Sequence, residues 1–332
     1  MLKHVIEVIE LLDRPETSGH LLADHLRAVY DAASTSASGD ETGPAPRIEV
    51  STVTGDKGST DFVHVTVPGR RGRTAGGEAP TLGVLGRLGG AGARPERIGL
   101  VSDADGAVAA LSAAAKLLDM HARGDVLDGD VLISTHVTGW APTQPHDPVP
   151  FMDSPVDMET CNREEVSPEM DAIVSIDTTK GNRLLNHRGV ALSPTICAGW
   201  ILRVSEDLLS VLETVTGQPA RVLPVTTQDI TPYGNGVHHI NSILQPATAT
   251  AAPVVGLAIT AETAVAGCAT GASHETDIAA AARFAIETAK AFGTGAARFH
   301  DPAELGRLVE LYGPMTQLQA APKQPTAPTE RK

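Results

Sequence analysis

Apolar residues at the start of the chain recur every three or four positions over residues 2–12, which is the spacing of one face of a helix. Pro15 ends this segment, and Ser18 is placed to cap a second helix that carries Leu22, Leu26 and Val29. Three later segments with the same spacing begin near Asp105, Ser205 and His274. The pattern therefore predicts five helices.

Short apolar or alternating runs between these helices indicate β-strands. They lie at residues 47–54, 62–67, 81–86, 131–136, 172–177, 222–227 and 253–259. Strands that alternate with helices are typical of a mostly parallel sheet with helices on both faces. We therefore expect an α/β fold with three αβα layers around a mostly parallel central sheet.

The other segments are polar or rich in glycine and proline. We expect mobile loops at about residues 32–46 and 69–79, no regular structure in the proline-rich segment 139–160, and a disordered tail at 319–332. No repeat or linker divides the rest of the chain. Residues 1–318 are therefore interpreted as a single α/β domain.

Composition narrows the classes of partner. The 332 residues carry a formal charge of −14, so the basic surface that nucleic acid requires is not expected. No apolar run reaches the length of a membrane span, and no membrane partner is expected. The three cysteines are odd in number and unclustered, which is typical of free thiols in a reducing compartment. We expect a cytoplasmic enzyme or binding protein.

Four side chains that commonly bind metals stand at predicted strand ends or helix starts: Asp103, His136, Asp177 and His274. Carboxylates with imidazole form a set that suits zinc, manganese or a related divalent ion. Adjacent strands would bring His136 and Asp177 to the edge where open α/β sheets place their chemistry. Structural roles are the alternative, because Asp103 or Asp105 could cap a helix and a single histidine often only packs in the core.

A second group is positively charged and lies in or beside the same loops: Arg87, Arg94, Lys180, Arg183 and Arg188. Arginine can grip a carboxylate or phosphate with two parallel hydrogen bonds. Glycines at 89, 90 and 92 leave backbone N–H groups free to assist. This group predicts a small anionic or peptide-like substrate, and solvated loop charge is the alternative.

The loop that precedes the last predicted strand supplies three more substrate-binding candidates: Asp229, His238 and His239. Glu262 and Cys268 are further candidates for contact with a ligand. Cys268 lacks the sequence context of a nucleophile elbow, so we do not expect it to act as a nucleophile.

The order of these motifs resembles the zinc aminopeptidases and carboxypeptidases, most of all their glutamyl-aminopeptidase-like branch. The similar stretches are Thr17–Leu26, Asp103-Ala-Asp-Gly106, Gly129–His136, Met170–Asp177, Thr227-Gln-Asp229, Pro253–Ile259 and Ser273-His-Glu275. The resemblance implies a zinc-exopeptidase-like (phosphorylase/hydrolase-like) fold. It also implies that Asp103 bridges two metals and that Asp177 and His274 bind metal.

The chain departs from this clan at three motifs. The first ligand motif, His-x-Asp, falls on Arg87-Leu-Gly89, and the Glu-Glu pair falls on His136-Val137. The insertion that builds the aminopeptidase oligomers is absent, so those assemblies are not expected, although another homo-oligomer remains open. His136 is then either a metal ligand or a general base in place of the carboxylate, and Asp105 is the second candidate catalytic residue.

Over almost its whole length the chain is similar to an uncharacterised prokaryotic family, the domain of unknown function DUF1177. The phrases that carry this likeness are Lys57-Gly-Ser-Thr-Asp61, Pro150-Phe-Met152, Asp177-Thr-Thr-Lys-Gly-Asn182, Thr227-Gln-Asp-Ile-Thr-Pro-Tyr-Gly234 and Gly267-Cys-Ala-Thr-Gly-Ala-Ser-His-Glu275. This resemblance implies no established activity.

Together these patterns predict a metal-dependent, hydrolase-like enzyme with a divalent metal, zinc, as cofactor. Its substrate would be a small amide or peptide that carries a carboxylate, gripped by Arg87 or Lys180. The alternative is a metal-free, hydrolase-like protein that binds or isomerises a small anionic metabolite through its Arg and Lys loops.

Overall fold

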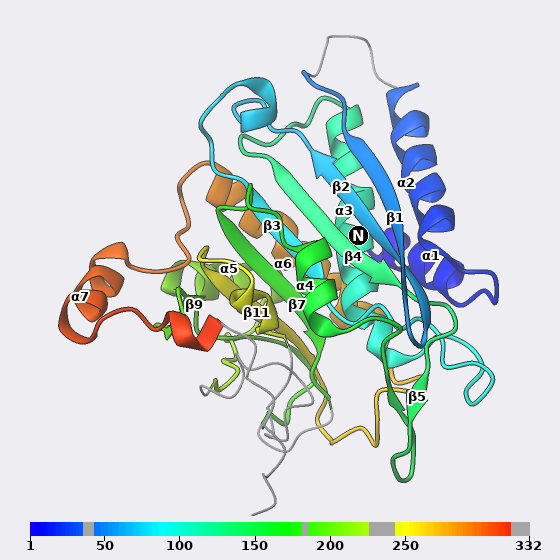
Figure 1. Ribbon diagram of the computed structural model, residues 1–332. Helices are drawn as coiled ribbons and strands as arrows, with labels where there is room; N and C mark the ends of the chain where they lie inside the picture. The colour runs from blue at the N-terminus through cyan, green and yellow to red at the C-terminus, as the bar shows by residue number, and fades with distance from the viewer. Residues whose placement is uncertain (36–42, 181–184, 226–242, 320–332) are drawn as a thin grey trace, which may run out of the picture.

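The structure, a computed structural model, describes residues 1–35, 43–180, 185–225 and 243–319. Its centre is a nine-stranded sheet (Figure 1). The strands of this sheet are β1 (Arg47–Gly55), β2 (Gly58–Val67), β3 (Leu82–Gly86), β4 (Val131–Val137), β7 (Ala172–Thr178), β8 (Gly189–Leu192), β9 (Ile196–Cys197), β10 (Trp200–Ile201) and β11 (Val254–Thr260). A separate ribbon pairs β5 (Thr143–Gln144) with β6 (Phe151–Met152).

The centre of the sheet is parallel and its sides are antiparallel. Strands β4, β3, β7 and β11 are neighbours in that order and all run in one direction. On one side β2 and β1 continue the sheet antiparallel, and on the other side β8, β9 and β10 do so. The prediction of a mostly parallel sheet is thus confirmed for the centre, whereas the sheet as a whole is mixed.

The helices are α1 (Leu2–Leu12), α2 (Gly19–Ser34), α3 (Asp105–Ala122), α4 (Met158–Glu165), α5 (Glu206–Thr216), α6 (Glu275–Gly293) and α7 (Pro302–Tyr312). All five predicted helices are present. Ser18 and Ser205 accept the backbone N–H groups of Leu21 and Leu208, each at 3.2 Å, as N-caps do. Gly217 ends α5 in the left-handed conformation at φ 66°, which glycine adopts without strain.

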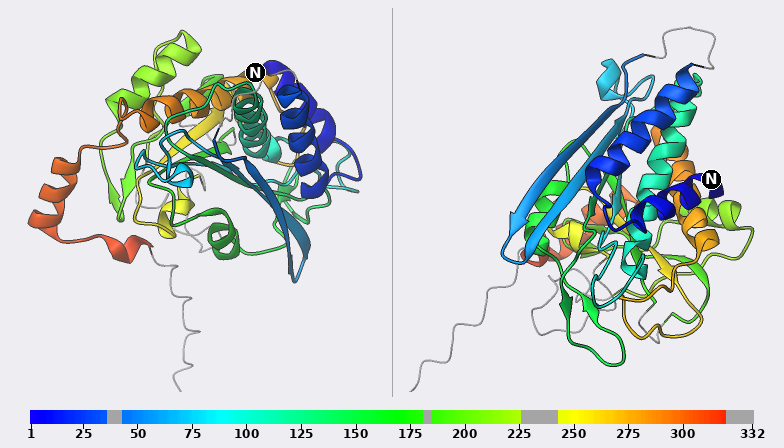
Figure 2. Two further views of the ribbon diagram at one scale, coloured as in Figure 1. Left: turned by 90° about the horizontal axis from the view of Figure 1, so that it is seen from above. Right: turned by 90° about the vertical axis from the view of Figure 1, so that its right-hand side faces the viewer.

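The helical layers are unequal. Helices α1, α2, α3, α5 and α6 gather on one face of the sheet, and α4 lies against the other face (Figure 2). The eight residues of α4 and the 3-10 helix η4 (Gln245–Thr248) are the helical cover of that second face within the described residues. The expected three layers are therefore present, but the layer around α4 is thin.

The core between the sheet and α3 explains why this helix is rich in alanine. Nearly the whole helix is buried, and it crosses β3, β4 and β7. At its first turn a Cβ atom on Gly106 would lie 2.4 Å from the carbonyl oxygen of Ile176, so only glycine permits this approach. Small residues thus let α3 lie directly on the parallel strands and fix its N-terminus beside the strand ends.

Several expectations about the loops differ from the structure. The proline-rich segment 139–160 contains the β5–β6 ribbon and the start of α4, because two short strands can pair around its prolines. The glycine-rich segment 69–79 is anchored, since Gly69 N–H and the Thr74 side chain both donate hydrogen bonds to Asp130. Of the predicted strand 222–227, the described residues show a single bridge between Leu192 and Val222. None of the described helices is both long and apolar enough to cross a membrane.

Candidate functional site

The carboxyl ends of the parallel strands meet at the lower edge of the sheet in Figure 1. Gly86 at the end of β3 is paired with Thr135 of β4 and with Ile176 of β7. The next residue on each strand is Arg87, His136 or Asp177, so these three side chains start side by side. This is the edge at which open α/β sheets bind ligands.

A buried charged network crosses this edge. Glu165, the last residue of α4, contacts the Nη1 atom of Arg87 with one carboxylate oxygen and lies 2.6 Å from Nδ1 of His136 with the other. The side chains of Arg87 and Glu165 are completely buried. Burial by itself would raise the pKa of Glu165, but the charge of Arg87 and the hydrogen bond from His136 outweigh it and hold the pKa below its ordinary value.

The second ring nitrogen of His136 is also occupied. The backbone N–H of Gly89 donates to Nε2 at 3.0 Å. Because Nε2 accepts a hydrogen bond, the neutral ring carries its proton on Nδ1 and donates it to Glu165. In this arrangement His136 has no lone pair left for a metal or for a substrate proton. The geometry therefore departs from the expectation that His136 is a ligand or a base, and gives it a positioning role.

The glycine loop after β3 needs its small residues because it lies against this network. A Cβ atom on Gly89 would fall 1.5 Å from the carbonyl oxygen of His136, and one on Gly90 would fall 2.6 Å from Oδ2 of Asp103. The loop therefore lies directly against the end of β4 and the carboxylate of Asp103. The N–H groups of Gly89 and Gly90, which the sequence suggested were free for a ligand, bond to His136 and Asp103.

Asp103 lies in the 3-10 helix η2 (Ser102–Ala104) that precedes α3. Its carboxyl group is buried and is hydrogen-bonded by the Gly90 N–H and the Cys268 thiol. Burial raises the pKa of Asp103 well above its ordinary value, and the nearby charge of Asp177 raises it further. The two hydrogen bonds to its oxygens oppose this shift without reversing it. The protonated form of Asp103 is therefore favoured.

A second buried ion pair involves Asp105, two residues after Asp103. The ammonium group of Lys180 contacts Oδ2 of Asp105 and donates a hydrogen bond of 2.8 Å to the carbonyl of Ala272. Ser273 donates to Oδ1 of Asp105 at 2.5 Å. Burial raises the pKa of Asp105, and the charge of Lys180 offsets part of the shift. Both groups are thus occupied by each other, which differs from the expectation of a free substrate-binding lysine and a free catalytic Asp105.

The other predicted candidates are distributed more widely. Arg94 donates to the backbone carbonyls of Gly139 and Asp13, so it connects loops and does not join the charged network of Arg87, His136 and Glu165. His274 is the N-cap residue of α6, is half-buried, and makes no side-chain capping bond. Arg188 pairs with Asp277 on α6, and Glu262 is exposed. The candidates Arg183, Asp229, His238 and His239 lie outside the described residues.

The predicted metal ligands do not assemble around one ion in the described part of the chain. No group of three or more His, Cys, Asp and Glu side chains there is arranged to hold a metal. Asp103 and Asp177 are close enough to interact electrostatically, but the imidazole of His136 is fully hydrogen-bonded. The described donor set therefore does not fit a zinc site.

Comparison with known proteins places the chain in a family. Residues 51–322 match the family model described as protein of unknown function (DUF1177). The chain belongs to the DUF1177 family. No curated protein matches it. Among solved structures, glutaminyl cyclase from Macrostomum lignano is similar with a TM-score of 0.45 and 14% sequence identity, over 90% of each chain.

The DUF1177 match includes all the charged side chains gathered at the strand ends, called the strand-end cluster below. Arg87, Asp103, His136, Glu165 and Asp177 all fall within the matched residues, whereas α1 and α2 precede them. The cluster is therefore built from the part of the chain that defines the family.

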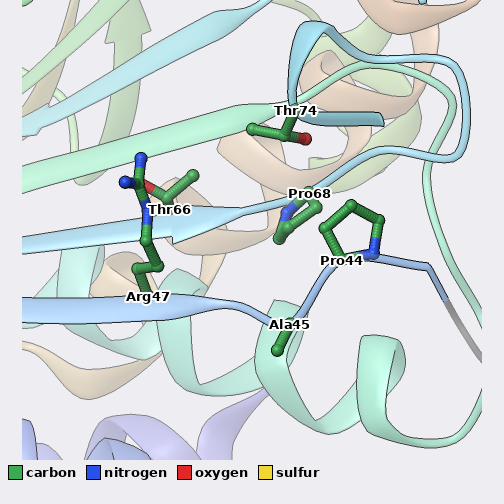
Figure 3. A pocket seen from close by; sticks show the side chains of 6 residues that line it. All are labelled: Pro44, Ala45, Arg47, Thr66, Pro68 and Thr74. Carbon is green, nitrogen blue, oxygen red and sulfur yellow. The ribbon is translucent and has the colours of Figure 1, made fainter. Parts of the chain in front are cut away.

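Two open cavities lie at the opposite edge of the sheet. One, of about 280 Å³, is lined by Pro44, Ala45, Arg47, Thr66, Pro68 and Thr74 (Figure 3). The other, of about 560 Å³, lies between the loop 70–80 and the end of α6. Thr66 pairs with Leu132 near the start of β4, so the first cavity is at the amino end of the parallel strands. Neither cavity includes a residue of the strand-end cluster.

Glu165 is the functional candidate that sequence reasoning missed. Its partners are 78 and 29 positions away along the chain, so no local spacing marks them. The signal that could have found it is chemical: a buried arginine after a central strand requires a carboxylate partner.

Proposed function

We propose that the chain is a hydrolase of a small amide or peptide-type substrate that works by general acid–base catalysis, with Asp103 and Asp177 as the catalytic pair. One observation carries the proposal. Two buried carboxylates share the carboxyl edge of the sheet, and burial together with the charge of Asp177 favours the protonated form of Asp103. Paired carboxyls in unequal protonation states can divide the work of an acid and a base.

In the proposed reaction, the ionised carboxylate of Asp177 accepts a proton from water as the water oxygen bonds to the substrate carbonyl carbon. The carboxyl proton of Asp103 passes to the amide nitrogen as the C–N bond breaks. The products are a carboxylic acid and an amine. A proton then returns from Asp177 to Asp103, so the enzyme finishes in its starting state.

The surrounding residues would hold this pair in place. Gly90 N–H donates to Asp103, and the preceding Gly89 N–H is fixed by Nε2 of His136. Glu165 in turn fixes the tautomer of His136, and Arg87 balances the charge of Glu165. The network thus supports the acid through the backbone of the glycine loop.

The two expectations from the sequence receive less support. A zinc mechanism needs ligands that the described residues do not bring together, so no step is assigned to a metal. Binding of an anion by Lys180 or Arg94 would require each to leave its present partners.

The test is a hydrolysis screen over dipeptides and N-acyl amino acids, repeated with a chelator. Asp103→Asn and Asp177→Asn should each lower the rate by about 10²–10⁴-fold, because each removes one proton-transfer group. Asp119→Asn is the matched control, since Asp119 is an acid at the protein surface on α3 that pairs with Lys116 and Arg123.

Full activity in Asp103→Asn would contradict the proposal. Activity that is lost on chelation and restored by zinc would support the metal-dependent hydrolase instead.

A further inference from the structure

Four polar side chains between the sheet and α4 or η4 carry hydrogen-bonding atoms without a partner in the described structure: Arg87, Asn162, Ser175 and Gln245. Each is at most 6% exposed. A buried polar atom without a hydrogen bond costs about 1–3 kcal/mol, so four such residues in one layer require an explanation.

These side chains belong to one layer of the protein. Ser175 lies between Leu85 and Gly256 in the sheet and points to the same face as Asp177, because alternate residues of a strand share a face. Asn162 precedes Glu165 by almost one turn of α4 and approaches the Gln245 carbonyl at 3.5 Å. A Cβ atom on Gly256 would meet Ile243, which places the segment before Gln245 over β11. Arg87 and Ser175 thus belong to the sheet side of this layer, and Asn162 and Gln245 belong to the segments that cover it.

The guanidinium group of Arg87 is used on one side only. Its Nη1 atom contacts Glu165, whereas Nε and Nη2 are buried and make no hydrogen bond to the described residues. The N–H groups of Nε and Nη2 lie along one edge of the planar group and point the same way. This edge matches the two oxygens of a carboxylate, which it can bind with two parallel hydrogen bonds.

We infer that the Nε and Nη2 edge of Arg87 binds the carboxylate of a small ligand, with Asn162, Ser175 and Gln245 as neutral hydrogen-bonding partners. Glu165 holds the arginine in place from its other side. Because Arg87 and Asp177 start from neighbouring strand ends, a carboxylate held here lies beside the proposed acid–base pair. The inference rests on the proposed function only in naming the substrate class: amides that carry a free carboxylate.

Binding is measured by calorimetry with two probes that differ in one group, N-acetylglycine and N-acetylglycinamide. The wild-type protein should bind the carboxylate at least about tenfold more tightly than the neutral amide. Arg87→Lys keeps the charge beside Glu165 but removes the two-pronged edge, and it should lose that preference. Arg94→Lys is the matched control, because the Arg94 side chain donates to backbone carbonyls. This variant should bind both probes as the wild type does.

A second measurement needs no variant. In wild-type protein labelled with ¹⁵N-arginine, N-acetylglycine should shift the Nε–H signal of Arg87 and leave that of Arg94 in place. Equal affinity for the two probes, or an unmoved Arg87 signal at saturation, would overturn the inference. The Asp103→Asn variant separates the two proposals. Its binding of N-acetylglycine tests the role of Arg87, and its rate of hydrolysis tests the acid–base mechanism.

Discussion

The two faces of the central sheet are built from alternate residues of the same four parallel strands, yet they differ in chemistry. Toward α3 and α6 the strands present mainly aliphatic side chains, among them Val84, Ile133, Val174 and Leu257. The hydroxyl groups of Thr135 and Thr178 on this face donate to backbone carbonyls. Toward α4 and η4 the same strands present Leu85, Ile173 and Ala258, which belong to a second and smaller apolar cluster. The same face also carries Ser134 and Ser175, and the strand ends add Arg87, His136 and Asp177. The α3 face is therefore almost wholly apolar. The α4 face, called the polar face below, combines a smaller apolar cluster with hydrogen-bonding and charged groups near the strand ends.

The energies of the two faces differ in kind. Burial of an aliphatic side chain contributes about 1.5–3 kcal/mol, and the α3 face gathers many of them. A buried ion pair contributes little net stability because desolvation offsets the attraction of its charges. We conclude that the α3 face supplies most of the apolar packing, and that the charged network at the ends of the strands on the α4 face is retained for its chemistry.

The largest effect is expected from breaking the ion pair on the polar face. Glu165→Leu leaves the charge of Arg87 buried without a partner, and should lower the free energy of unfolding by about 3–5 kcal/mol. The double variant Arg87→Met with Glu165→Leu removes both charges and should recover most of that loss. Urea unfolding measures both. A double variant as unstable as the single one would show that the polar face also carries the stability of the fold.

A cavity on the apolar face should cost slightly less and leave binding intact. Leu111 of α3 is completely buried in the core cluster. Leu111→Ala should lower the free energy of unfolding by about 3 kcal/mol, because it removes packed atoms that the surroundings cannot replace. Its affinity for N-acetylglycine, measured in parallel, should match the wild type. A large loss of affinity without unfolding would contradict the separation of the two faces.

The pH dependence of stability should show opposite contributions from two acids of the polar face. The pKa of Glu165 is lowered in the folded protein, so its contribution is present above its ordinary pKa of 4.5 and is lost as the pH falls through the folded pKa. The pKa of Asp103 is raised, so its charge costs stability as the pH rises above 3.8 toward the folded pKa.

Asp103→Asn should therefore be more stable than the wild type at neutral pH, and the difference should shrink as the pH falls toward 3.8. Thermal unfolding over this range measures the difference. A variant that is less stable at neutral pH would contradict the raised pKa.

The smallest effect is expected from His121, a polar residue on the helical side. It is buried on α3 beside the ring of Tyr30, and neither ring nitrogen has a hydrogen-bond partner in the described structure. Burial lowers the pKa of His121 in the folded protein, so folding favours its neutral form. This contribution to stability is lost as the pH falls below 6.5 toward the folded pKa. His121→Leu should raise the free energy of unfolding by about 1 kcal/mol and should weaken its dependence on pH over that range. If the free energy of unfolding of the variant falls below pH 6.5 as steeply as that of the wild type, groups other than His121 cause the fall.

The sequence was sufficient where local pattern decides structure. The apolar runs that became β3, β4, β7 and β11 are long and uniform, and the caps Ser18 and Ser205 mark their helices by residue type. The same runs placed Arg87, His136 and Asp177 at one edge. The roles of these residues could not be read from pattern, because each depends on a partner distant in sequence.

The missing partners explain the differences at the site. Without Glu165, His136 looks like a free imidazole, and without Asp105, Lys180 looks like a free cation. The polar sequence of α4 has no apolar periodicity to mark it as a helix over the sheet, so the residue that fixes His136 was left out.

The protonation state of Asp103 tests the account most directly. The ¹³C chemical shift of its carboxyl carbon, identified by comparison with Asp103→Asn, can be followed against pH in the wild-type protein. The account predicts a carboxyl group that titrates well above its ordinary pKa of 3.8, because burial and the charge of Asp177 disfavour its ionised form. A group that titrates near its ordinary pKa of 3.8 would contradict the assignment of Asp103 as the acid, and with it the proposed hydrolase mechanism.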